Sequence, residues 1–315
     1  MRNAFIRTLT KIARKEKRIY LLTADLGYTV FEEFREEFPE RFYNVGVAEA
    51  NMRGVAAGLA LSGKIVFIYS IVPFVTYRCY DHIRNDLCYH NLNVKIIGVG
   101  GGYSYGNQGQ THHAIEDIGA MQSLPNLTVV SPGDPLEVEW ATQAIAFRPG
   151  PVYMRLEKSG EPILHKKNVS FKIGRGILMK EGTDLTLLAT GSMLKNALKV
   201  AELLELKNLT ARVISIHTIK PIDMEIILKA AAETPALFTI EEHVLTNGLG
   251  NSVAALLIEN IKKKIFFKRI GLPDKFFKEI GSQKYFQRRT GLSEEQILKT
   301  ICKFVKKKGK NEHAH

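Results

Sequence analysis

The sequence predicts an α/β protein of two domains, each with a mainly parallel sheet flanked by helices. Short apolar runs alternate with longer segments of helical periodicity along almost the whole chain. The alternation starts again after a polar stretch at 158–172 that contains Pro162. A length of 315 residues allows two cores of ordinary size. Strands that alternate with helices favour parallel sheets covered on both faces.

Short apolar runs predict the strands of the first half. The third run, KIVFIY, and the fourth, NVKIIGV, have the length and composition of buried strands. A polar turn, Ala24–Gly27, follows the first strand, and a glycine-rich loop at 98–109 follows the fourth. The strands are expected at 20–23, 42–45, 64–69, 93–99, 127–130 and 152–155.

Helical periodicity fills the intervals between these strands. Near the N-terminus Phe5, Ile6, Leu9, Ile12 and Ala13 fall on one helical face, a pattern that differs from a signal peptide. Helices are expected at 4–16, at 31–38 before Pro39, from Glu49 within the stretch that ends at Gly63, at about 75–90 and at 135–146, with a short helical turn at 115–121.

The second half repeats the alternation. Its strands are expected at 185–190, 211–215, 237–241 and 265–270, and its helices at 193–206, 223–232, 251–262 and 293–306. Residues 307–315 are expected to be a disordered tail. The predicted domains are therefore 1–160 and 175–306, joined by a linker at 161–174.

Composition restricts the class of protein. An apolar content of 45% and a charged content of 24% are those of a globular chain. The net charge of +12 is concentrated in the last quarter without a nucleic-acid motif, which favours a solvated basic face or steering of an anionic substrate. The sequence contains no apolar run of 18 residues, so no membrane span is predicted. Cys79, Cys88 and Cys302 show no metal spacing or disulfide framework, so a cytoplasmic protein is expected.

One stretch, Tyr43–Gly63, combines a strand end with a helix rich in small residues. Small side chains predict a buried, tightly packed helix, and Glu49 stands at its start. One interpretation of Glu49 is structural: a negative charge in the first turn interacts favourably with the helix dipole. The other is a carboxylate placed to bond a ligand, because long charged side chains are rarely buried unpaired.

Several polar and aromatic groups follow strands of the first predicted sheet. Ligands bind beyond the carboxyl ends of parallel strands. Each group also has a structural interpretation, such as a turn former, a core aromatic or a surface histidine. Their joint position at one edge favours a site. The groups are Asp25, Glu49, Ser70–Tyr77, the loop 98–113 and Arg155.

An ordered set of motifs resembles the C-terminal half of transketolase, which some organisms make as a separate subunit. The resemblance covers almost the whole chain, and the THHAIED run at 111–117 is closer to transketolase than to related enzymes. Deoxyxylulose phosphate synthase and the β-subunits of 2-oxo acid dehydrogenases share the two-domain plan and are the competing enzymes. A binding module without catalysis is a further alternative. The motifs are TADLG (23–27), NVGVAEANMRGVAAGLALSG (44–63), SIVPFVTYRCYDHIRNDL (70–87), GYSYGNQGQTHHAIEDIGAMQSLPNLTVVSPGD (102–134), GPVYMRLEK (150–158) and TIEEHVLTNGLGN (239–251).

The resemblance implies a pyrimidine-binding domain for thiamine diphosphate in the first half. Glu49 matches the catalytic glutamate that bonds N1′ of the aminopyrimidine and favours the imino tautomer, which takes the proton from the thiazolium C2. Phe74 matches the aromatic residue that stacks on the pyrimidine, and Tyr77 an aromatic residue lining the same pocket. Asp25 matches an aspartate near the cofactor.

The resemblance also implies a set of substrate-binding residues. His112 matches a histidine that contacts substrate hydroxyls and assists proton transfer. Arg155 matches an arginine that binds the sugar phosphate, and Thr29 stands where a phosphate-binding serine is usual. Two positions depart from the family: Gln108 replaces an aspartate that contacts the acceptor sugar, and Gly100 replaces a phosphate-binding histidine. These departures predict ketol transfer to an altered acceptor, one without the usual terminal phosphate.

The other half of transketolase, which holds Mg²⁺ and the diphosphate, has no counterpart here. The chain is therefore expected to need an α-subunit, in an α₂β₂ assembly with a β–β or pseudo-two-fold interface. The second domain matches the family's C-terminal domain, whose role is mainly assembly. Its Glu241, Glu242 and His243 are interpreted as structural.

Overall fold

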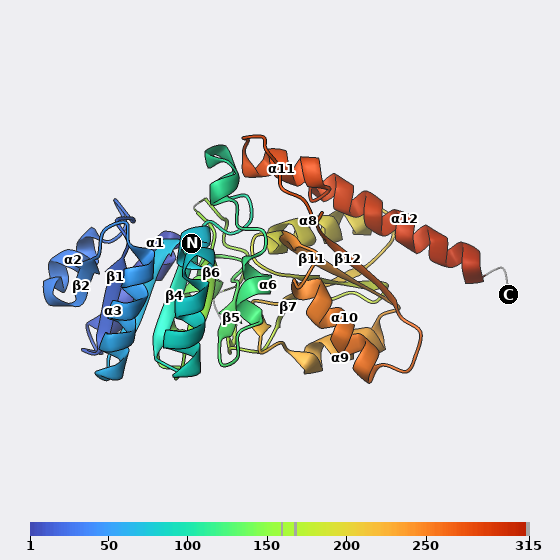
Figure 1. Ribbon diagram of the computed structural model, residues 1–315. Coiled ribbons are helices and arrows are strands. Elements are labelled where there is room, and N and C mark those ends of the chain that lie inside the picture. The colour runs from blue at the N-terminus through green and yellow to red at the C-terminus, as the bar shows by residue number, and fades with distance from the viewer. Residues whose placement is uncertain (159, 167–168, 313–315) are drawn as a thin grey trace.

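The computed structural model describes residues 1–158, 160–166 and 169–312, with side chains as far as residue 305. It contains two α/β domains with mainly parallel sheets, which lie side by side in Figure 1. The predicted fold class is confirmed. Within the described residues no helix is long and apolar enough to cross a membrane.

The first sheet has the strand order β10-β5-β6-β4-β3-β1-β2. All its strands from the first half were expected, and they pair in parallel. The edge strand β10 (Thr218–Lys220) was not expected: it comes from the second half and pairs antiparallel with β5. The other strands are β1 (Ile19–Thr23), β2 (Phe42–Asn44), β3 (Ile65–Ile71), β4 (Val94–Val99), β5 (Thr128–Val130) and β6 (Val152–Leu156).

The helices of the first half follow the prediction except at 75–90, where one long helix is wrong. The chain there forms α4 (Val72–Val75), a 3-10 turn η2 (Tyr77–Cys79), α5 (Tyr80–His82) and a π-helical segment η3 (Ile83–Tyr89). The break lies at Thr76, whose hydroxyl bonds the Val72 carbonyl at 2.7 Å. The other helices are α1 (Arg2–Ala13), α2 (Glu32–Glu37), α3 (Glu49–Leu61), α6 (Asp117–Gln122) and α7 (Pro135–Ala146), with short 3-10 turns η1 (Pro39–Arg41), η4 (Gly106–Gln108) and η5 (Gln110–His112).

The second sheet has the order β12-β11-β8-β9-β7, with β7 antiparallel at one edge. Besides β10, three parts of this half differ from the prediction: β7 and α11 were not expected, and α12 continues to residue 312 where a disordered tail was expected from 307. Residues 313–315 of that tail lie outside the described residues. The elements are β7 (Ile177–Lys180), β8 (Leu185–Ala189), α8 (Met193–Glu205), β9 (Ala211–Ser215), α9 (Met224–Glu233), β11 (Ala236–Val244), α10 (Leu249–Asn260), β12 (Phe266–Leu272), α11 (Gln283–Thr290) and α12 (Glu294–Glu312).

The two domains share a hydrophobic core. One buried cluster combines Met52 of α3 and Ile118 of α6 with Ile214 of β9 and Leu249 of α10. A second cluster lies between the first sheet and α1 and α7, and includes Phe5. Because buried apolar side chains of both halves pack together, the edge of the first sheet is held rigidly against the second domain.

Candidate cofactor and substrate site

Glu49 is a buried carboxylate at the start of α3. Its side chain is only 2% exposed. The hydroxyl of Ser70, at the end of β3, donates to Oε1 at 3.3 Å, and Nη1 of Arg78 lies 2.9 Å from Oε2. The carboxylate therefore has one hydroxyl partner and one cationic partner, which lie on different elements. Such burial with a dedicated pair of partners goes beyond what a first-turn glutamate on a solvated helix needs.

Arg53 lies one turn further along α3 and is fully buried. It donates from Nη1 to the backbone carbonyl of Glu49 at 2.8 Å and from Nη2 to the carbonyl of Val75 in α4. Burial lowers the pKa of this guanidinium to about 10, so it remains charged at neutral pH. Arg53 thus ties the start of α3 to the end of α4 and places a fixed cation behind Glu49.

Phe74, Arg78 and His112 form a small cluster beside Glu49. The guanidinium carbon of Arg78 lies 4.7 Å from the centroid of the Phe74 ring. The ring of His112, in η5, meets Phe74 edge-on at 5.1 Å between centroids. Partial burial lowers the pKa of His112, so the imidazole is neutral at pH 7 and can accept a proton. The structure therefore brings Glu49, Phe74 and His112 to one place.

Tyr77 lies beside this cluster but near other partners. The charges near its phenol are those of Glu116 and Asp117, at the start of α6. Burial, followed by the repulsion of these carboxylates, raises the pKa of Tyr77 well above its usual value. Tyr77 is consequently a neutral phenol that faces the first turn of α6.

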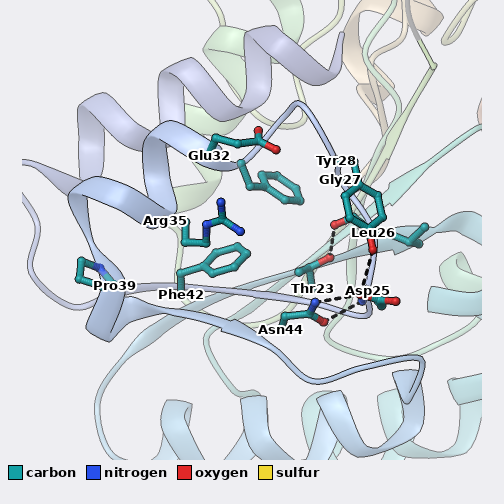
Figure 2. Close-up of a pocket in the computed structure, with 11 residues that line it drawn as sticks. Thr23, Asp25, Leu26, Gly27, Tyr28, Glu32, Arg35, Pro39, Phe42 and Asn44 are labelled. Carbon is teal, nitrogen blue, oxygen red and sulfur yellow. Dashed lines mark hydrogen bonds between the residues drawn. The ribbon is translucent and has the colours of Figure 1, made fainter.

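Asp25 and Thr29 lie in the turn after β1, where both backbones have positive φ. Asn44 fixes Asp25: its amide nitrogen donates to the Asp25 carboxylate at 3.0 Å, and its amide oxygen accepts the Asp25 N–H at 3.0 Å. Asp25 lines a cavity of about 370 Å³ with an aromatic side formed by Phe31 and Phe42 (Figure 2). Thr29 is exposed, and so is Gln108 in η4.

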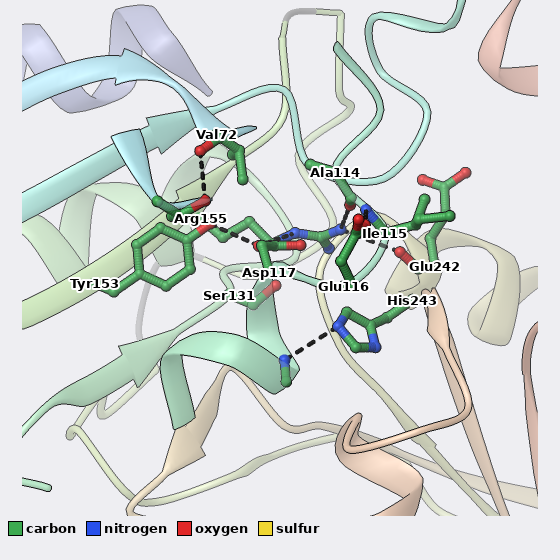
Figure 3. Close-up of polar contacts among 12 residues, drawn as sticks. Val72, Ala114, Ile115, Glu116, Asp117, Ser131, Tyr153, Arg155, Glu242 and His243 are labelled. Carbon is green, nitrogen blue, oxygen red and sulfur yellow. Dashed lines mark hydrogen bonds and ion pairs between the residues drawn. The ribbon is translucent and has the colours of Figure 1, made fainter. Parts of the chain in front are cut away.

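Arg155 is buried where the two domains meet. It is buried in β6, where Nε lies 3.0 Å from Asp117 Oδ2 and Nη2 donates to the carbonyls of Ala114 and Glu242 (Figure 3). The guanidinium is engaged with both domains and is 2% exposed. These bonds place Arg155 at the boundary between the two domains, and its expected role toward a sugar phosphate stays a prediction.

The acidic and histidine residues at the end of β11 also make structural contacts. Glu241 accepts the backbone N–H groups of Leu249 and Gly250 at the start of α10. His243 accepts the N–H of Gly119 in α6, which joins the two domains (Figure 3). Glu242 accepts from Gln283 and Gln287 of α11. These contacts agree with the structural interpretation of the run.

Two site residues were missed by the sequence analysis. Arg78 is adjacent to the predicted Tyr77 and stands four residues after Phe74, which is the spacing of neighbours on a helix face. Arg53 was hidden among the small residues of α3. For Arg53 the available signal was a lone arginine in an otherwise apolar segment, which needs a partner when it is buried.

Comparison with known proteins places this site in a family. Residues 1–161 match the family model of the transketolase pyrimidine binding domain, and residues 174–297 match that of the transketolase C-terminal domain. The chain belongs to the transketolase family.

Its relatives include separate chains that correspond to half of a transketolase. A putative transketolase C-terminal section of Methanocaldococcus jannaschii is 39% identical, and the alignment covers 98% of this chain and 96% of the relative. A 6-deoxy-6-sulfo-D-fructose transketolase subunit of Clostridium sp. is 36% identical, covering 98% of this chain and 95% of the relative. A solved structure described as a split gene transketolase, inactive beta4 tetramer, has a TM-score of 0.89 at 36% identity and covers 97% of this chain and 98% of that one.

Proposed function

We propose that this chain is the β-subunit of a thiamine diphosphate-dependent transketolase that transfers a two-carbon ketol unit between sugars. The observation that carries the proposal is the buried carboxylate of Glu49 together with the ring of Phe74, since one side chain, Arg78, contacts both of them. An aminopyrimidine needs both: an aromatic surface for its ring and a carboxylate for its ring nitrogen. The family match over both domains supports the same cofactor.

The side chains of the site fit this group by their chemistry. Phe74 offers a ring face, and Glu49 offers a carboxyl oxygen that Ser70 bonds, while Arg53 bonds the backbone carbonyl of Glu49. Bound thiamine diphosphate supplies a nucleophilic carbon and an electron sink. Glu49 would hold the proton at N1′, while Asp25 and Tyr77 would line the cofactor pocket. The diphosphate and Mg²⁺ would be held mainly by the partner subunit.

His112 is proposed to contact substrate hydroxyls and to move a proton. Its lowered pKa leaves the imidazole neutral at pH 7. Its ring lies against Phe74, so we place the reacting part of a sugar beside His112, above the cofactor ring. Gln108 and Thr29 are exposed, and together with the buried Arg155 they complete the proposed substrate set. An amide at Gln108 donates as well as accepts hydrogen bonds, in contrast to the aspartate usual there.

The acceptor is proposed to differ from that of common transketolases. At Gly100, where a phosphate-binding histidine is usual, an added Cβ would lie 2.1 Å from the ring of Tyr105, and φ is +92°. A histidine cannot stand at this position while Tyr105 fills the space. The absence of this histidine fits an acceptor without the usual terminal phosphate. The proposal is refuted if ribose 5-phosphate is as good an acceptor here as for common transketolases.

A partner α-subunit is proposed to complete the site. The relatives are separate subunits, and one solved relative is named an inactive tetramer of β chains. One side of α3 is exposed in this chain and carries Gly54, Val55, Gly58 and Leu61. Its glycines would let a partner approach this side of α3 closely. We propose an α₂β₂ enzyme of the cytoplasm, with a cofactor domain at 1–160, a linker at 161–174 and an assembly domain from 175.

The test is an assay of the complex. The chain is co-expressed with the neighbouring α-subunit, supplied with thiamine diphosphate and Mg²⁺, and tested for ketol transfer from a ketose donor. Turnover of a 2-oxo acid without any ketose turnover would replace the proposal with a dehydrogenase β-subunit or a deoxyxylulose-type synthase. Glu49→Ala should abolish transfer and leave the melting temperature within a few degrees, while Glu36→Ala on exposed α2 is the matched control.

A further inference from the structure

Arg78 contacts both groups that the aminopyrimidine would use, the ring of Phe74 and the carboxylate of Glu49. Its guanidinium lies over the Phe74 ring at 4.7 Å and pairs with Glu49 Oε2 at 2.9 Å. Phe74 is half-buried and packs against the core cluster beneath α1 and α7, so only part of the ring remains available to a ligand. The guanidinium of Arg78 already lies over this half-buried ring.

A guanidinium and an aminopyrimidine resemble each other in the features that matter here. Both are planar and delocalised, both lie flat on an aromatic face, and both donate in-plane N–H bonds to a carboxylate. The two groups cannot occupy the same ring face and bond the same buried oxygen together. Either the arginine leaves when the cofactor binds, or the cofactor binds elsewhere.

We propose that Arg78 holds the pyrimidine position in the cofactor-free chain and that the cofactor displaces it into solvent. This inference rests on the proposed function and deepens it, because it identifies a residue that determines cofactor affinity. The side chain of Arg78 is 51% exposed, whereas that of Glu49 is 2% exposed. Arg78 can therefore swing outward without opening the core, while Glu49 stays in place.

Displacement does not leave Glu49 as an uncompensated buried charge. Arg53 remains behind the first turn of α3, bonded to the Glu49 carbonyl, and it is fully buried. Ser70 continues to donate to Oε1. The carboxylate thus keeps one cation and one hydroxyl in both states, and Arg78 is the partner that can be exchanged.

The consequence is competition for the site. A ligand that must displace a residue binds with an affinity reduced by the fraction of protein in which the site is free. A half-exposed ion pair together with one cation–π contact corresponds to about a fivefold reduction. Removing Arg78 should therefore tighten cofactor binding, although it removes a positive charge from the site of an anionic ligand.

The experiment is a calorimetric titration of the α–β complex with thiamine diphosphate in saturating Mg²⁺. Arg78→Ala and Arg78→Gln are compared with wild type and with Arg84→Ala, which removes the same charge from an exposed position bonded only to Asn85 among the contacts of the described residues. We expect both Arg78 variants to bind the cofactor about fivefold more tightly than wild type. The control should bind it with unchanged affinity. Equal or weaker binding would overturn the inference, because loss of a favourable charge predicts weakening.

A second measurement does not depend on turnover. Without cofactor, the Arg78 variants lose the pair with Glu49 and should melt at lower temperature than Arg84→Ala. With saturating cofactor they should melt with the wild type. Equal losses in both states would mean that Arg78 stays on Glu49 when the cofactor is bound, which contradicts displacement. If the wild-type complex binds no thiamine diphosphate, the proposed function itself fails; binding without an Arg78 effect rejects only the inference.

Discussion

At the scale of single residues, the site depends on how burial changes charge. Glu49 is kept beside cations, whereas partial burial favours the neutral form of His112 by lowering its pKa. A buried carboxylate and a neutral imidazole are suited to different tasks. The first holds a proton at a fixed atom, and the second accepts and returns one.

The pH dependence of ketol transfer should report on His112. Because its pKa is lowered, the imidazole loses its proton below the usual value of 6.5, and the active neutral form persists into mildly acidic solution. We expect kcat/KM to fall on the acid side with an apparent pKa below 6.5. His112→Asn should remove this limb and reduce kcat by about 10² to 10⁴. An acid limb that is unchanged in the variant would assign it to another group.

At the scale of elements, the broken helix after β3 is the feature that builds the site. A continuous helix at 75–90 would close its own backbone bonds. The break at Thr76 leaves the Val75 carbonyl free to accept from Arg53, and Arg78, which follows the break, reaches both Glu49 and the Phe74 ring. The apolar pattern alone could not predict this break, because it depends on a side chain from α3.

Arg53 should therefore contribute to stability. Arg53→Met leaves the carbonyl of Val75 without its donor and removes the cation behind Glu49. We expect the free energy of unfolding to fall by about 2–4 kcal/mol, measured by urea denaturation of the chain. Arg41→Met, which removes a half-exposed arginine that bonds two carbonyls after α1, is the control and should cost less. A loss no greater than that of the control would mean that the buried bonds are not stabilising.

At the scale of the whole molecule, the linker is pinned by a buried histidine. His165 lies between Asp134 and Glu137 of the first domain, with ring nitrogens 3.1 Å from a carboxylate oxygen of each. Glu137 also accepts from Ser215 in β9 of the second domain. These two carboxylates outweigh the opposing effect of burial and raise the pKa of His165 to about 9.

Stability should consequently decrease in alkaline solution. A folded pKa of about 9 above the unfolded 6.5 means that the contribution is complete below pH 6.5 and is lost as pH rises through 9. The loss should be about 2–3 kcal/mol, seen as a falling melting temperature between pH 7 and 9.5. His165→Gln should be less stable at pH 6 but nearly flat over this interval. A variant with the same slope as wild type would assign the loss to other groups.

The predicted strands at 64–69 and 93–99 and the position of Glu49 could be read from the chain because they depend on local composition and on order along it. The edge strand β10, the break at Thr76 and the burial of Arg155 could not, because each is decided by a partner distant in sequence: β5, Arg53 and Asp117.

The sequence by itself determined the alternation of strands and helices, the family motifs and the residue types that gather at one sheet edge, since periodicity and composition are local properties. Only the tertiary structure decided which of those residues meet. It paired Glu49 with Arg78, turned Arg155 inward to join the domains and filled the space at Gly100 with Tyr105. The physical reason is that burial and pairing of charges depend on contacts between segments far apart in the chain.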